Sequence, residues 1–370
     1  MKIQYCKISL FNSEIPGISF DKQGVSNFAK NILWRLKNET FNDAELLKKK
    51  IEKIKYYGKK KEYDCVIGIS GGVDSSYVAY LVKKFKLKPL AVHLDNGWNS
   101  NLATQNIYRL VKKLNIDLIT KVVEWDEFKD LQIAYLKSSV MDLENATDQA
   151  IDALLYQTAY KWGIKYVIHG GNVATESGMP RAWTYDNRDS INLLDIHKKF
   201  GSVQLKSYPI MKPYQLFYYL YLKKIKSFPI LNYVNFNKIH ATEILKKNFD
   251  WVPYKNKHGE NIYTKFYQDY YLPKKYNIDK RIVHLSSMIL SNQITLDEGK
   301  KILSRKLLDK ETDLLINYVS KKLEISSNQL LSYVNSKKID HTYYRNRKWL
   351  FNHDNILVKV ARKFAKDEYF

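Results

Sequence analysis

The sequence contains little cysteine, little glycine and no long hydrophobic run. Its 370 residues include two cysteines, Cys6 and Cys65, which excludes a fold held together by disulfides. No apolar stretch approaches the roughly 20 residues that cross a bilayer, and residues 12–14 interrupt any signal-type block at the N-terminus. A hydrophobic content of 45% excludes a disordered chain. We therefore expect a globular, cytoplasmic protein that does not insert into a membrane.

The chain is strongly basic. It has 61 Lys and Arg against 38 Asp and Glu, a formal net charge of +23. Such an excess fits an anionic partner, either nucleic acid or a phosphorylated metabolite. A composition rich in Lys, Asn, Ile and Tyr also follows from AT-rich codons, and the charge is spread along the chain rather than gathered on one element. We therefore expect no nucleic-acid partner.

Apolar runs of strand length alternate with helical spacing between residues 61 and 170. Four runs are continuous enough for strands buried in a parallel sheet: 65–69, 89–94, 118–123 and 166–168. Apolar residues at helical spacing separate them, near 78–85, 107–114 and 151–159. This alternation predicts an α/β fold with a doubly wound parallel sheet.

Three regions follow from this pattern. We expect an N-terminal lobe with a helical linker over 1–60, the sheet domain over 61–215, and a mainly helical C-terminal region over 216–370. In the last region, Thr295 and Glu298 form a capping box that opens a helix. Further helices are expected near 312–322, 327–334 and 356–366.

The turn after the first expected strand carries the chemistry. It reads Ser70-Gly71-Gly72-Val73-Asp74-Ser75-Ser76. The two glycines permit a tight turn whose N–H groups face an anion, and the last two serines begin a helix whose N-terminus favours phosphate. Asp74 beside an anion site indicates a bridging cation such as Mg²⁺. No Lys precedes Ser75, so the turn matches neither the Walker A pattern nor the dinucleotide fingerprint.

This turn resembles the pyrophosphatase loop of the N-type ATP pyrophosphatases, the PP-loop enzymes with a HUP-like fold. They include asparagine and GMP synthetases, tRNA thiolases and lysidine synthetase, which adenylate a substrate oxygen, release pyrophosphate and let a nucleophile displace AMP. The resemblance implies ATP and Mg²⁺ as cofactors and residues 70–76 as the pyrophosphate site. It also implies nucleotide contacts where the second and fourth strands end, at His93, Leu94, Asp95, Asn96, Gly170, Gly171, Asn172 and Thr175.

Segments later in the chain narrow the resemblance to one family within this class of enzymes. In chain order they are Asp95-Asn96-Gly97-Trp98-Asn99-Ser100, Thr147-Asp148-Gln149-Ala150-Ile151, Gly170-Gly171-Asn172-Val173-Ala174-Thr175-Glu176, Trp251-Val252-Pro253-Tyr254, Lys257-His258, Phe266-Tyr267-Gln268-Asp269-Tyr270-Tyr271-Leu272-Pro273, Asp279-Lys280-Arg281 and His284-Leu285-Ser286-Ser287. Together they resemble the N-acetyl-sugar amidotransferase family. The resemblance implies conversion of a sugar acetamido group to an acetamidino group, in the biosynthesis of lipopolysaccharide O-antigen or of flagellar pseudaminic or legionaminic acid.

The implied reaction attaches AMP to the acetamido oxygen, and ammonia then displaces the AMP. Such an enzyme has to clamp phosphate charge and position two reactants. By analogy with the basic residue of asparagine synthetase, Lys280 and Arg281 are candidate clamps for the departing pyrophosphate. A solvated basic helix start is an equal alternative for both.

Five further residues are candidates for proton, metal or substrate contacts. Asp148 and Glu176 are candidates for Mg²⁺ or for proton handling, although carboxylates at a helix start also satisfy local N–H groups. Gln149 stands where the family has His, so we assign no catalytic base there and keep it as a substrate contact. Arg181 and Trp183 are candidates for contact with the sugar or nucleotide, and a core position for Trp183 is an equal alternative.

The chain offers no source of ammonia. An N-terminal-nucleophile glutaminase needs Cys directly after Met1, where this chain has Lys2, and Cys65 lies in a buried strand. The family resemblance implies two partners of the imidazole-glycerol-phosphate-synthase type, a glutaminase subunit and a cyclase-like subunit that channels ammonia. The substrate is a sugar or a nucleotide-linked sugar.

Two other functions compete with this one. A tRNA-modifying enzyme performs the same adenylation, and the charge of +23 suits it. Thiolation needs reactive cysteines, for which only Cys6 is a candidate, and the later segments do not match lysidine synthetase. A scaffold without turnover would not need the intact loop at residues 70–76.

The first 30 residues follow the outline of the family's zinc ribbon, in which two Cys-x-x-Cys pairs are expected. Here the pairs read Cys6-x-x-Ser9 and Ser26-x-x-Ala29. Structural zinc almost always takes four Cys or His ligands, so we expect a degenerate ribbon without structural zinc. Apolar residues should hold the lobe: Ile8, Leu10, Ile15, Ile18, Phe20, Val25 and Phe28.

Overall fold

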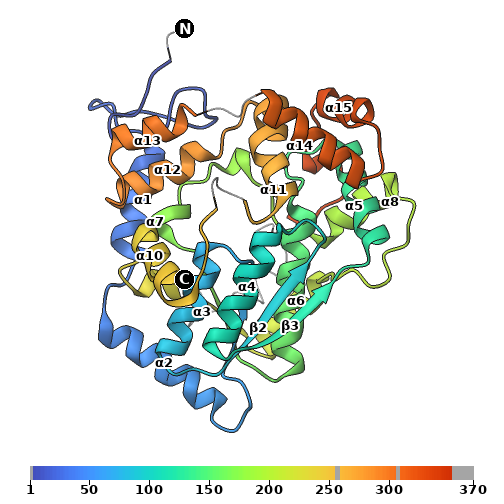
Figure 1. Ribbon diagram of the computed structural model, residues 1–370. Helices are drawn as coiled ribbons and strands as arrows, with labels where there is room; N and C mark the ends of the chain where they lie inside the picture. Colours follow the sequence, from blue (N-terminus) through green and yellow to red (C-terminus); the bar gives the residue numbers. More distant parts are fainter. Residues whose placement is uncertain (1–2, 255–258, 306–308, 352–370) are drawn as a thin grey trace.

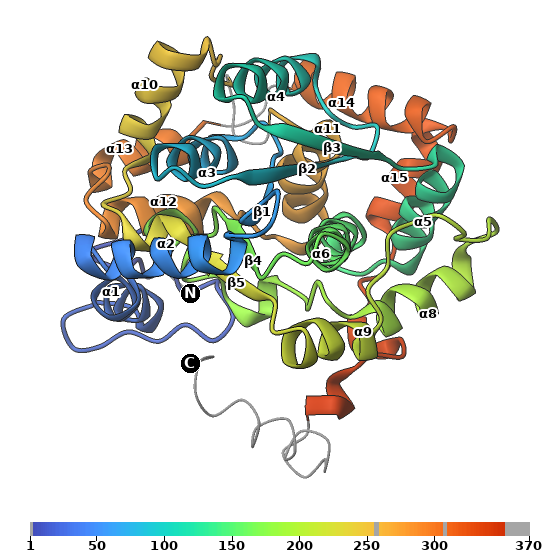
Figure 2. The ribbon, with the colours of Figure 1, turned by 90° about the horizontal axis from the view of Figure 1, so that it is seen from below.

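Five parallel strands form one sheet at the centre of the protein. The computed structural model describes residues 3–254, 259–305 and 309–351. The strands are β1 (Cys65–Gly68), β2 (Pro89–Asp95), β3 (Asp117–Val122), β4 (Tyr166–His169) and β5 (Lys226–Pro229). Their order is β3-β2-β1-β4-β5, so the direction of chain progression reverses at β1; Figure 1 labels β2 and β3, and Figure 2 labels all five strands. A ligand crevice is expected at such a reversal, beyond the carboxyl ends of the strands.

The first four strands lie where the apolar runs predict them, and the doubly wound parallel sheet is confirmed. Strand β5 was not predicted. It pairs with β4 from Tyr166 opposite Lys226 to His169 opposite Pro229. Its four residues include one lysine and one proline, so it lacks the apolar run that marks a buried strand. The sheet therefore extends past residue 215, where the sequence pattern placed the end of its domain.

Helices cover both faces of the sheet because side chains alternate along each strand. Those of the sheet domain are α3 (Val73–Lys84), α4 (Asn101–Leu114), α5 (Trp125–Ser138) and α6 (Asn145–Lys161). Cys65 and Ile67 of β1 pack with α3 and α4, whereas Val66 packs with α6 on the opposite face (Figure 2). The sequence pattern did not single out α5, which packs on α8 and α15 away from the sheet.

The N-terminal region has two helices, α1 (Asn27–Glu39) and α2 (Ala44–Gly58), where the sequence pattern predicted a helical linker. Asp43 caps α2 by accepting from the N–H groups of Glu45 and Leu46. Before α1, two isolated antiparallel bridges, Tyr5 with Asn12 and Phe20 with Ser26, give the lobe its shape.

The four positions of the expected Cys-x-x-Cys pairs do meet. The N–H of Ser26 donates to Cys6 Sγ at 3.3 Å, and the N–H of Ala29 donates to Ser26 Oγ at 3.1 Å. Burial raises the pKa of the Cys6 thiol, but hydrogen bonds from Ser26, Ser9 and Ile8 outweigh it, so the pKa is lowered. The apolar residues expected to hold the lobe are packed in or against the largest core cluster. The zinc content stays a prediction.

The remainder of the chain is mainly helical, as expected. Its elements are α7 (Val173–Glu176), η1 (Arg181–Trp183), α8 (Ser190–Phe200), α9 (Pro213–Phe217), η2 (Tyr218–Leu222), η3 (Ile230–Tyr233), α10 (Lys238–Phe249), α11 (Ile262–Phe266), η4 (Tyr267–Tyr276), α12 (Arg281–Leu290), α13 (Leu296–Leu303), α14 (Asp309–Lys322), α15 (Ser327–Asn335), η5 (His341–Tyr343) and η6 (Lys348–Phe351). The capping box before α13 is formed. The expected helix at 356–366 lies outside the described residues, as does the segment Lys257-His258. Among the described helices, none has the length and apolar content to cross a bilayer.

Candidate active site

The turn between β1 and α3 is a glycine-containing loop that leads directly into the N-terminus of α3. Gly72 is the N-cap of α3 and has no side chain to occupy the free N–H groups. The hydroxyl groups of Ser70 and Ser75 lie 3.1 Å apart, and Ser75 Oγ also accepts from the N–H of Ser70 at 3.2 Å. The hydroxyl of Ser76 is buried and has no hydrogen-bond partner among the described residues. This arrangement suits an anion that accepts several hydrogen bonds from N–H and hydroxyl groups.

Gly71 is required at its position for two reasons. Its φ is +83°, which glycine adopts without strain. A Cβ there would lie 3.0 Å from the carbonyl oxygen of Ala103 and 3.1 Å from Tyr254 Oη. The loop is therefore closed in by α4 on one side and by a distant segment on the other.

That distant segment holds the loop in place. The indole N–H of Trp251 donates to the carbonyl oxygen of Gly71 at 3.2 Å, and the hydroxyl of Tyr254 donates to the same oxygen at 2.9 Å. The side chain of Asn106 exchanges two hydrogen bonds of 2.9 Å with the backbone of Val252. The family resemblance pointed to residues 251–254, but nothing in the sequence assigned them this contact.

Asp74 faces a cation. Its Oδ2 lies 3.7 Å from Lys238 Nζ, and its Oδ1 is buried without a hydrogen-bond partner among the described residues. Gly170, after β4, fits against Asp74, since a Cβ there would lie 3.1 Å from Asp74 Cβ. A buried carboxylate oxygen without a donor is a suitable ligand for Mg²⁺. Asp74 and the phosphate-type loop thus fit the expected metal.

Lys238 is a functional candidate that sequence reasoning missed. It opens α10, in a region predicted only as helical. Burial lowers its pKa, but the carboxylates of Asp74, Glu176 and Glu260 outweigh burial, so the pKa is raised and the ammonium is held in its charged form. Lys238 and the candidate residue Glu176 are therefore close enough to interact electrostatically.

The end of β2 supports the loop. The Nδ1–H of His93 donates to the carbonyl oxygen of Ile69 at 2.8 Å, so Nε2 is the acceptor for the Asn99 amide at 3.0 Å. Burial lowers the pKa of His93, which keeps it neutral. Asp95 accepts from the N–H of Gly97, and Asn96 accepts from the N–H of Trp98. Adenosine contacts by these residues stay a prediction.

At the end of β4, three of the expected nucleotide contacts have a local role. Asn172 caps α7, where its Oδ1 accepts from both the N–H and the hydroxyl of Thr175. Gly171 donates its N–H to His169 Nδ1 at 3.1 Å. Glu176 is exposed at the end of this short helix.

A second polar cluster surrounds the N-terminus of α6, which carries Glu144 and Asp148 one turn apart. The hydroxyl of Thr264 donates to Glu144, and the Gln268 amide lies 3.4 Å from the other carboxylate oxygen. Lys280 lies 3.1 Å from the Tyr267 hydroxyl, which donates to Asp142.

Asp148 lies in the first turn of α6, where part of its surface reaches solvent and protein atoms crowd the rest. This crowding raises the pKa of Asp148 well above the usual range, and the charges of Glu144 and Asp142 raise it further, while Lys280 opposes them. Burial also raises the pKa of Glu144. A carboxyl with a raised pKa next to a phosphate site is typical of a group that exchanges protons near neutral pH.

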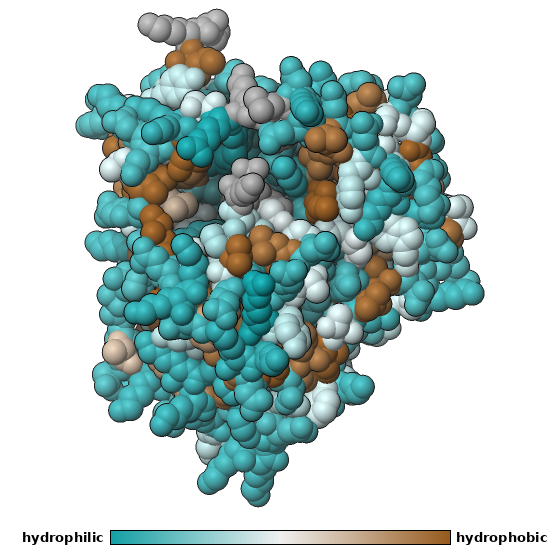
Figure 3. All heavy atoms as spheres, viewed as in Figure 1, coloured by the Kyte–Doolittle hydropathy of each residue, from teal (hydrophilic) through white to brown (hydrophobic). Residues whose placement is uncertain are grey.

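The two clusters share one crevice. The stretch from Glu260 to Gln268 contacts both, because a Glu260 carboxylate oxygen would lie 3.8 Å from a Cβ on Gly72, whereas Thr264 and Gln268 contact Glu144. Helix α6 packs on β1 and β2, so its N-terminus lies at the carboxyl edge of the sheet. Above this edge the surface is hollowed between the parts that carry α12 and α14 (Figures 1 and 3).

The structure separates the other candidates. Arg281 is held by the carboxylate of Asp279 at 2.7 Å and by the carbonyl oxygen of Arg305, whereas Lys280 joins the α6 cluster. Trp183 is 4% exposed and belongs to the core, and Arg181 is exposed. Gln149 is fully buried, and neither polar atom of its side chain has a partner among the described residues.

Comparisons with known proteins match two separate parts of the chain. Residues 44–177 match the family model described as NAD synthase, and residues 260–355 match the model described as "LPS biosynthesis protein WbpG-like, C-terminal domain". An uncharacterised protein of Methanocaldococcus jannaschii is 40% identical over 78 residues, or 20% of this chain. The chain spans 28% of the length of that curated relative.

Two solved structures cover most of the chain at low similarity. The NMN synthetase from Francisella tularensis has a TM-score of 0.35 and 16% identity, with 83% of this chain and 98% of that chain covered. The NH3-dependent NAD synthetase from Campylobacter jejuni has a TM-score of 0.32 and 17% identity, with 80% and 97% covered. Scores this low carry no argument about function.

The order of the two family matches along one chain is the order that the sequence motifs predict. The first contains the loop at residues 70–76, and the second begins with the residues that face this loop from across the crevice. The two matches together support the resemblance to the PP-loop ATP pyrophosphatase superfamily and, within it, to the N-acetyl-sugar amidotransferase family.

Proposed function

We propose that this protein is an ATP-dependent amidotransferase that converts a sugar acetamido group to an acetamidino group. The acetamido oxygen attacks the α-phosphorus of ATP, and the bond to the β-phosphate bridging oxygen breaks to release pyrophosphate. Ammonia then adds to the carbon of the O-adenylyl imidate, and its C–O bond breaks to release AMP. The product belongs to a bacterial surface polysaccharide or flagellar glycan.

One observation carries this proposal. The segment from Glu260 to Lys280 belongs to the part of the chain that matches lipopolysaccharide-biosynthesis proteins, and it builds one wall of the crevice whose other wall is the phosphate-type loop. Its groups there are carboxylate, hydroxyl, amide and ammonium, which suit the hydroxyl and amide groups of an acetamido sugar. ATP and sugar would thus meet between the two walls.

The phosphate wall acts through charge and position. The N–H groups at the start of α3 and the ammonium of Lys238 favour the negative charge that collects on the departing pyrophosphate. Asp74 and the phosphate oxygens would hold Mg²⁺, which supplies further charge neutralisation when bound. Trp251 and Tyr254 keep the loop backbone in its binding shape, so little reorganisation is needed on ATP binding.

The α6 cluster supplies proton handling. Forming the imidate removes the proton from the acetamido nitrogen, and we assign its acceptance to the Asp148 carboxylate. Ammonia itself brings the three N–H protons of the protonated amidine, so Asp148 releases the proton it accepted to solvent after AMP has left. The raised pKa of Asp148 makes it a stronger base than an ordinary aspartate, and Lys280 beside it limits the raise.

The nitrogen source in this proposal is a partner. A glutaminase subunit makes ammonia from glutamine, and a cyclase-like subunit conducts it to the crevice. The support is the sequence of this chain, whose two cysteines, Cys6 and Cys65, are both buried.

The test supplies the purified chain with ATP, Mg²⁺, a high concentration of ammonium and a panel of free and nucleotide-linked acetamido sugars. Pyrophosphate and AMP are measured by phosphorus NMR, and the sugar by mass spectrometry for exchange of oxygen for an NH group. Asp74→Asn should lower the rate by about 100-fold or more, because it removes a charge at the phosphoryl centre. Asp250→Asn is the matched control, since Asp250 forms a surface ion pair with Lys113.

The same experiment also tests the rival function. AMP formation that needs tRNA and occurs with no acetamido sugar would replace this proposal with a tRNA-modifying enzyme. Asp148→Asn tests the assigned base: its activity should lose the acid limb of the pH profile that the parent protein shows above the ordinary aspartate range. An unchanged limb would remove Asp148 from the mechanism.

A further inference from the structure

The segment of α9 and η2, residues 213–222, exposes its apolar side instead of burying it. Tyr214 is 66% exposed, Phe217 43% and Leu222 63%. Tyr214 and Phe217 are three residues apart, and Phe217 and Leu222 are five apart. The ring of Phe217 also lies 4.9 Å from that of Tyr221, four residues on. A helix on a globular protein normally turns this side to the core.

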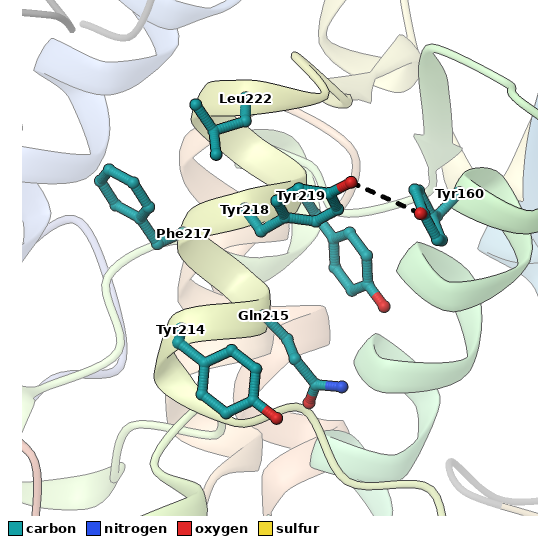
Figure 4. Close-up of a pocket in the computed structure, with 7 residues that line it drawn as sticks. All are labelled: Tyr160, Tyr214, Gln215, Phe217, Tyr218, Tyr219 and Leu222. Carbon is teal, nitrogen blue, oxygen red and sulfur yellow. Dashed lines mark hydrogen bonds between the residues drawn. The ribbon is translucent and has the colours of Figure 1, made fainter.

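A shallow pocket separates this segment from the end of α6. It measures about 400 Å³ and is lined by Tyr160, Tyr214, Gln215, Phe217, Tyr218, Tyr219 and Leu222 (Figure 4). Tyr218 and Tyr219 lie toward Tyr160, whereas Phe217 and Leu222 point away from it (Figure 4). The apolar groups that point away protrude from the helix and do not form a closed groove.

Lysines surround these aromatic groups. The ammonium of Lys223 lies 5.4 Å from the ring centre of Tyr160 and 5.1 Å from that of Tyr218. Burial lowers the pKa of Lys165, and the nearby Lys61, Lys223 and Lys224 lower it further. The charges that act on Lys165 are thus all positive, which favours an anionic partner.

This surface lies at the opposite end of the sheet from the crevice. Lys165 directly precedes β4 and Lys224 stands two residues before β5, so both lie at the amino ends of their strands. Helix α2 continues the surface, because Tyr57 lies 6.0 Å from Tyr166 and the neighbouring Tyr56 is 75% exposed. Figure 2 looks onto this end of the molecule, with α2 and α9 toward the viewer. A partner bound here leaves the crevice open.

We propose that this aromatic and lysine surface seats the protein on an anionic lipid bilayer, with Tyr214, Phe217 and Leu222 at the level of the headgroups. Tyrosine and other aromatic side chains favour the membrane–water interface, and lysines near them are attracted to anionic lipids. The protein lies on the bilayer without crossing it. This role is independent of the chemistry proposed for the crevice.

The charge argues for this occupant over a second copy of the chain. Two copies that meet through this face would bring Lys61, Lys165, Lys223 and Lys224 of each together, and like charges repel. An acidic protein or a nucleic acid would satisfy the lysines, but the protruding apolar groups suit insertion between lipid headgroups better than contact with a rigid charged backbone.

Vesicle sedimentation of the full chain tests the proposal. The protein should sediment with vesicles of phosphatidylcholine and phosphatidylglycerol and remain in the supernatant with phosphatidylcholine alone. Replacing two lysines, Lys223→Gln with Lys224→Gln, should weaken binding about 25-fold, since each lysine near an anionic surface contributes about fivefold. Phe217→Ser with Leu222→Ser should weaken it at any salt concentration.

The matched control is Tyr108→Ser. Tyr108 is 60% exposed on α4 and also has a lysine, Lys112, over its ring, but it lies outside the proposed surface. It should bind vesicles as the parent protein does, and all variants should keep the circular dichroism spectrum of the parent. Equal binding by the parent and the two double variants would overturn the proposal. So would capture of polyglutamate or an oligonucleotide in place of the anionic vesicles.

Discussion

Replacing Gly71 by alanine tests whether the shape of the phosphate loop depends on one small residue. The φ of +83° at this position costs an L-residue about 1–2 kcal/mol relative to glycine. In addition, the new Cβ would lie 3.0 Å from the Ala103 carbonyl oxygen, which belongs to the backbone of α4 and cannot rotate away. The loop therefore has to move.

That movement has a second cost. The same Cβ would lie 3.1 Å from Tyr254 Oη, the group that donates to the Gly71 carbonyl oxygen at 2.9 Å. Loss of this hydrogen bond costs about 1 kcal/mol. We expect Gly71→Ala to lower the free energy of unfolding by about 2–3 kcal/mol and to lower ATP-dependent pyrophosphate release by roughly 100-fold, because a displaced loop no longer positions the phosphates.

Gly17→Ala is a matched control for the backbone contribution. Its φ is +78°, but a Cβ there has no neighbour within 4 Å. It should cost about 1–2 kcal/mol and leave pyrophosphate release unchanged. Urea unfolding and a pyrophosphate assay on both variants provide the comparison. Equal stability loss in the two variants, with normal turnover by Gly71→Ala, would refute the role given to the contacts with α4 and Tyr254.

Three other predictions address nitrogen, metal and pH. The isolated chain should turn over with ammonium and not with glutamine, and a glutaminase partner should restore glutamine use; glutamine-dependent turnover by the pure chain would contradict this. Elemental analysis should find no zinc, with chelators leaving stability unchanged, whereas about one zinc per chain that is lost in Cys6→Ser would show a metal site in the lobe. Burial lowers the pKa of His341 to about 4 from an ordinary 6.5, so folding favours the neutral ring. Stability should be complete above about pH 6.5 and fall by up to about 3 kcal/mol as the pH drops toward 4, and urea unfolding of His341→Gln should show a smaller fall.

The sequence predicts those parts of the fold that repeat a simple physical pattern. Four strands and the turn at residues 70–76 have clear apolar runs and glycines, although β3, which was expected to be buried, is a partly exposed edge strand. Strand β5 has neither, because it is short and its hydrogen bonds to β4, not its side chains, define it. Local pattern carries no information about such a strand.

The candidate site likewise contains some residues that the sequence predicts and others that it does not. Asp74, Asp148 and Lys280 were predicted and line the crevice, because they lie next to strand ends or in motifs. Sequence reasoning missed Lys238 and Glu144, because the residues that contact them, Asp74 and Thr264, lie far away in the sequence. Arg281 neighbours Lys280 in the sequence, but Asp279 holds it, and no local pattern distinguishes the two.

The hydrogen bonds from Trp251 and Tyr254 to Gly71 have a consequence for the growing chain. About 180 residues separate the loop from the side chains that fix it, so a ribosome that adds 5–20 residues per second emits the loop roughly 10–35 s before its supports. In that interval β4 also lacks its outer neighbour, β5. A chain cut at residue 215 would remain in this unfinished condition, with an unsupported loop and an open sheet edge. The part of the chain that carries the loop therefore depends for its completion on residues made much later.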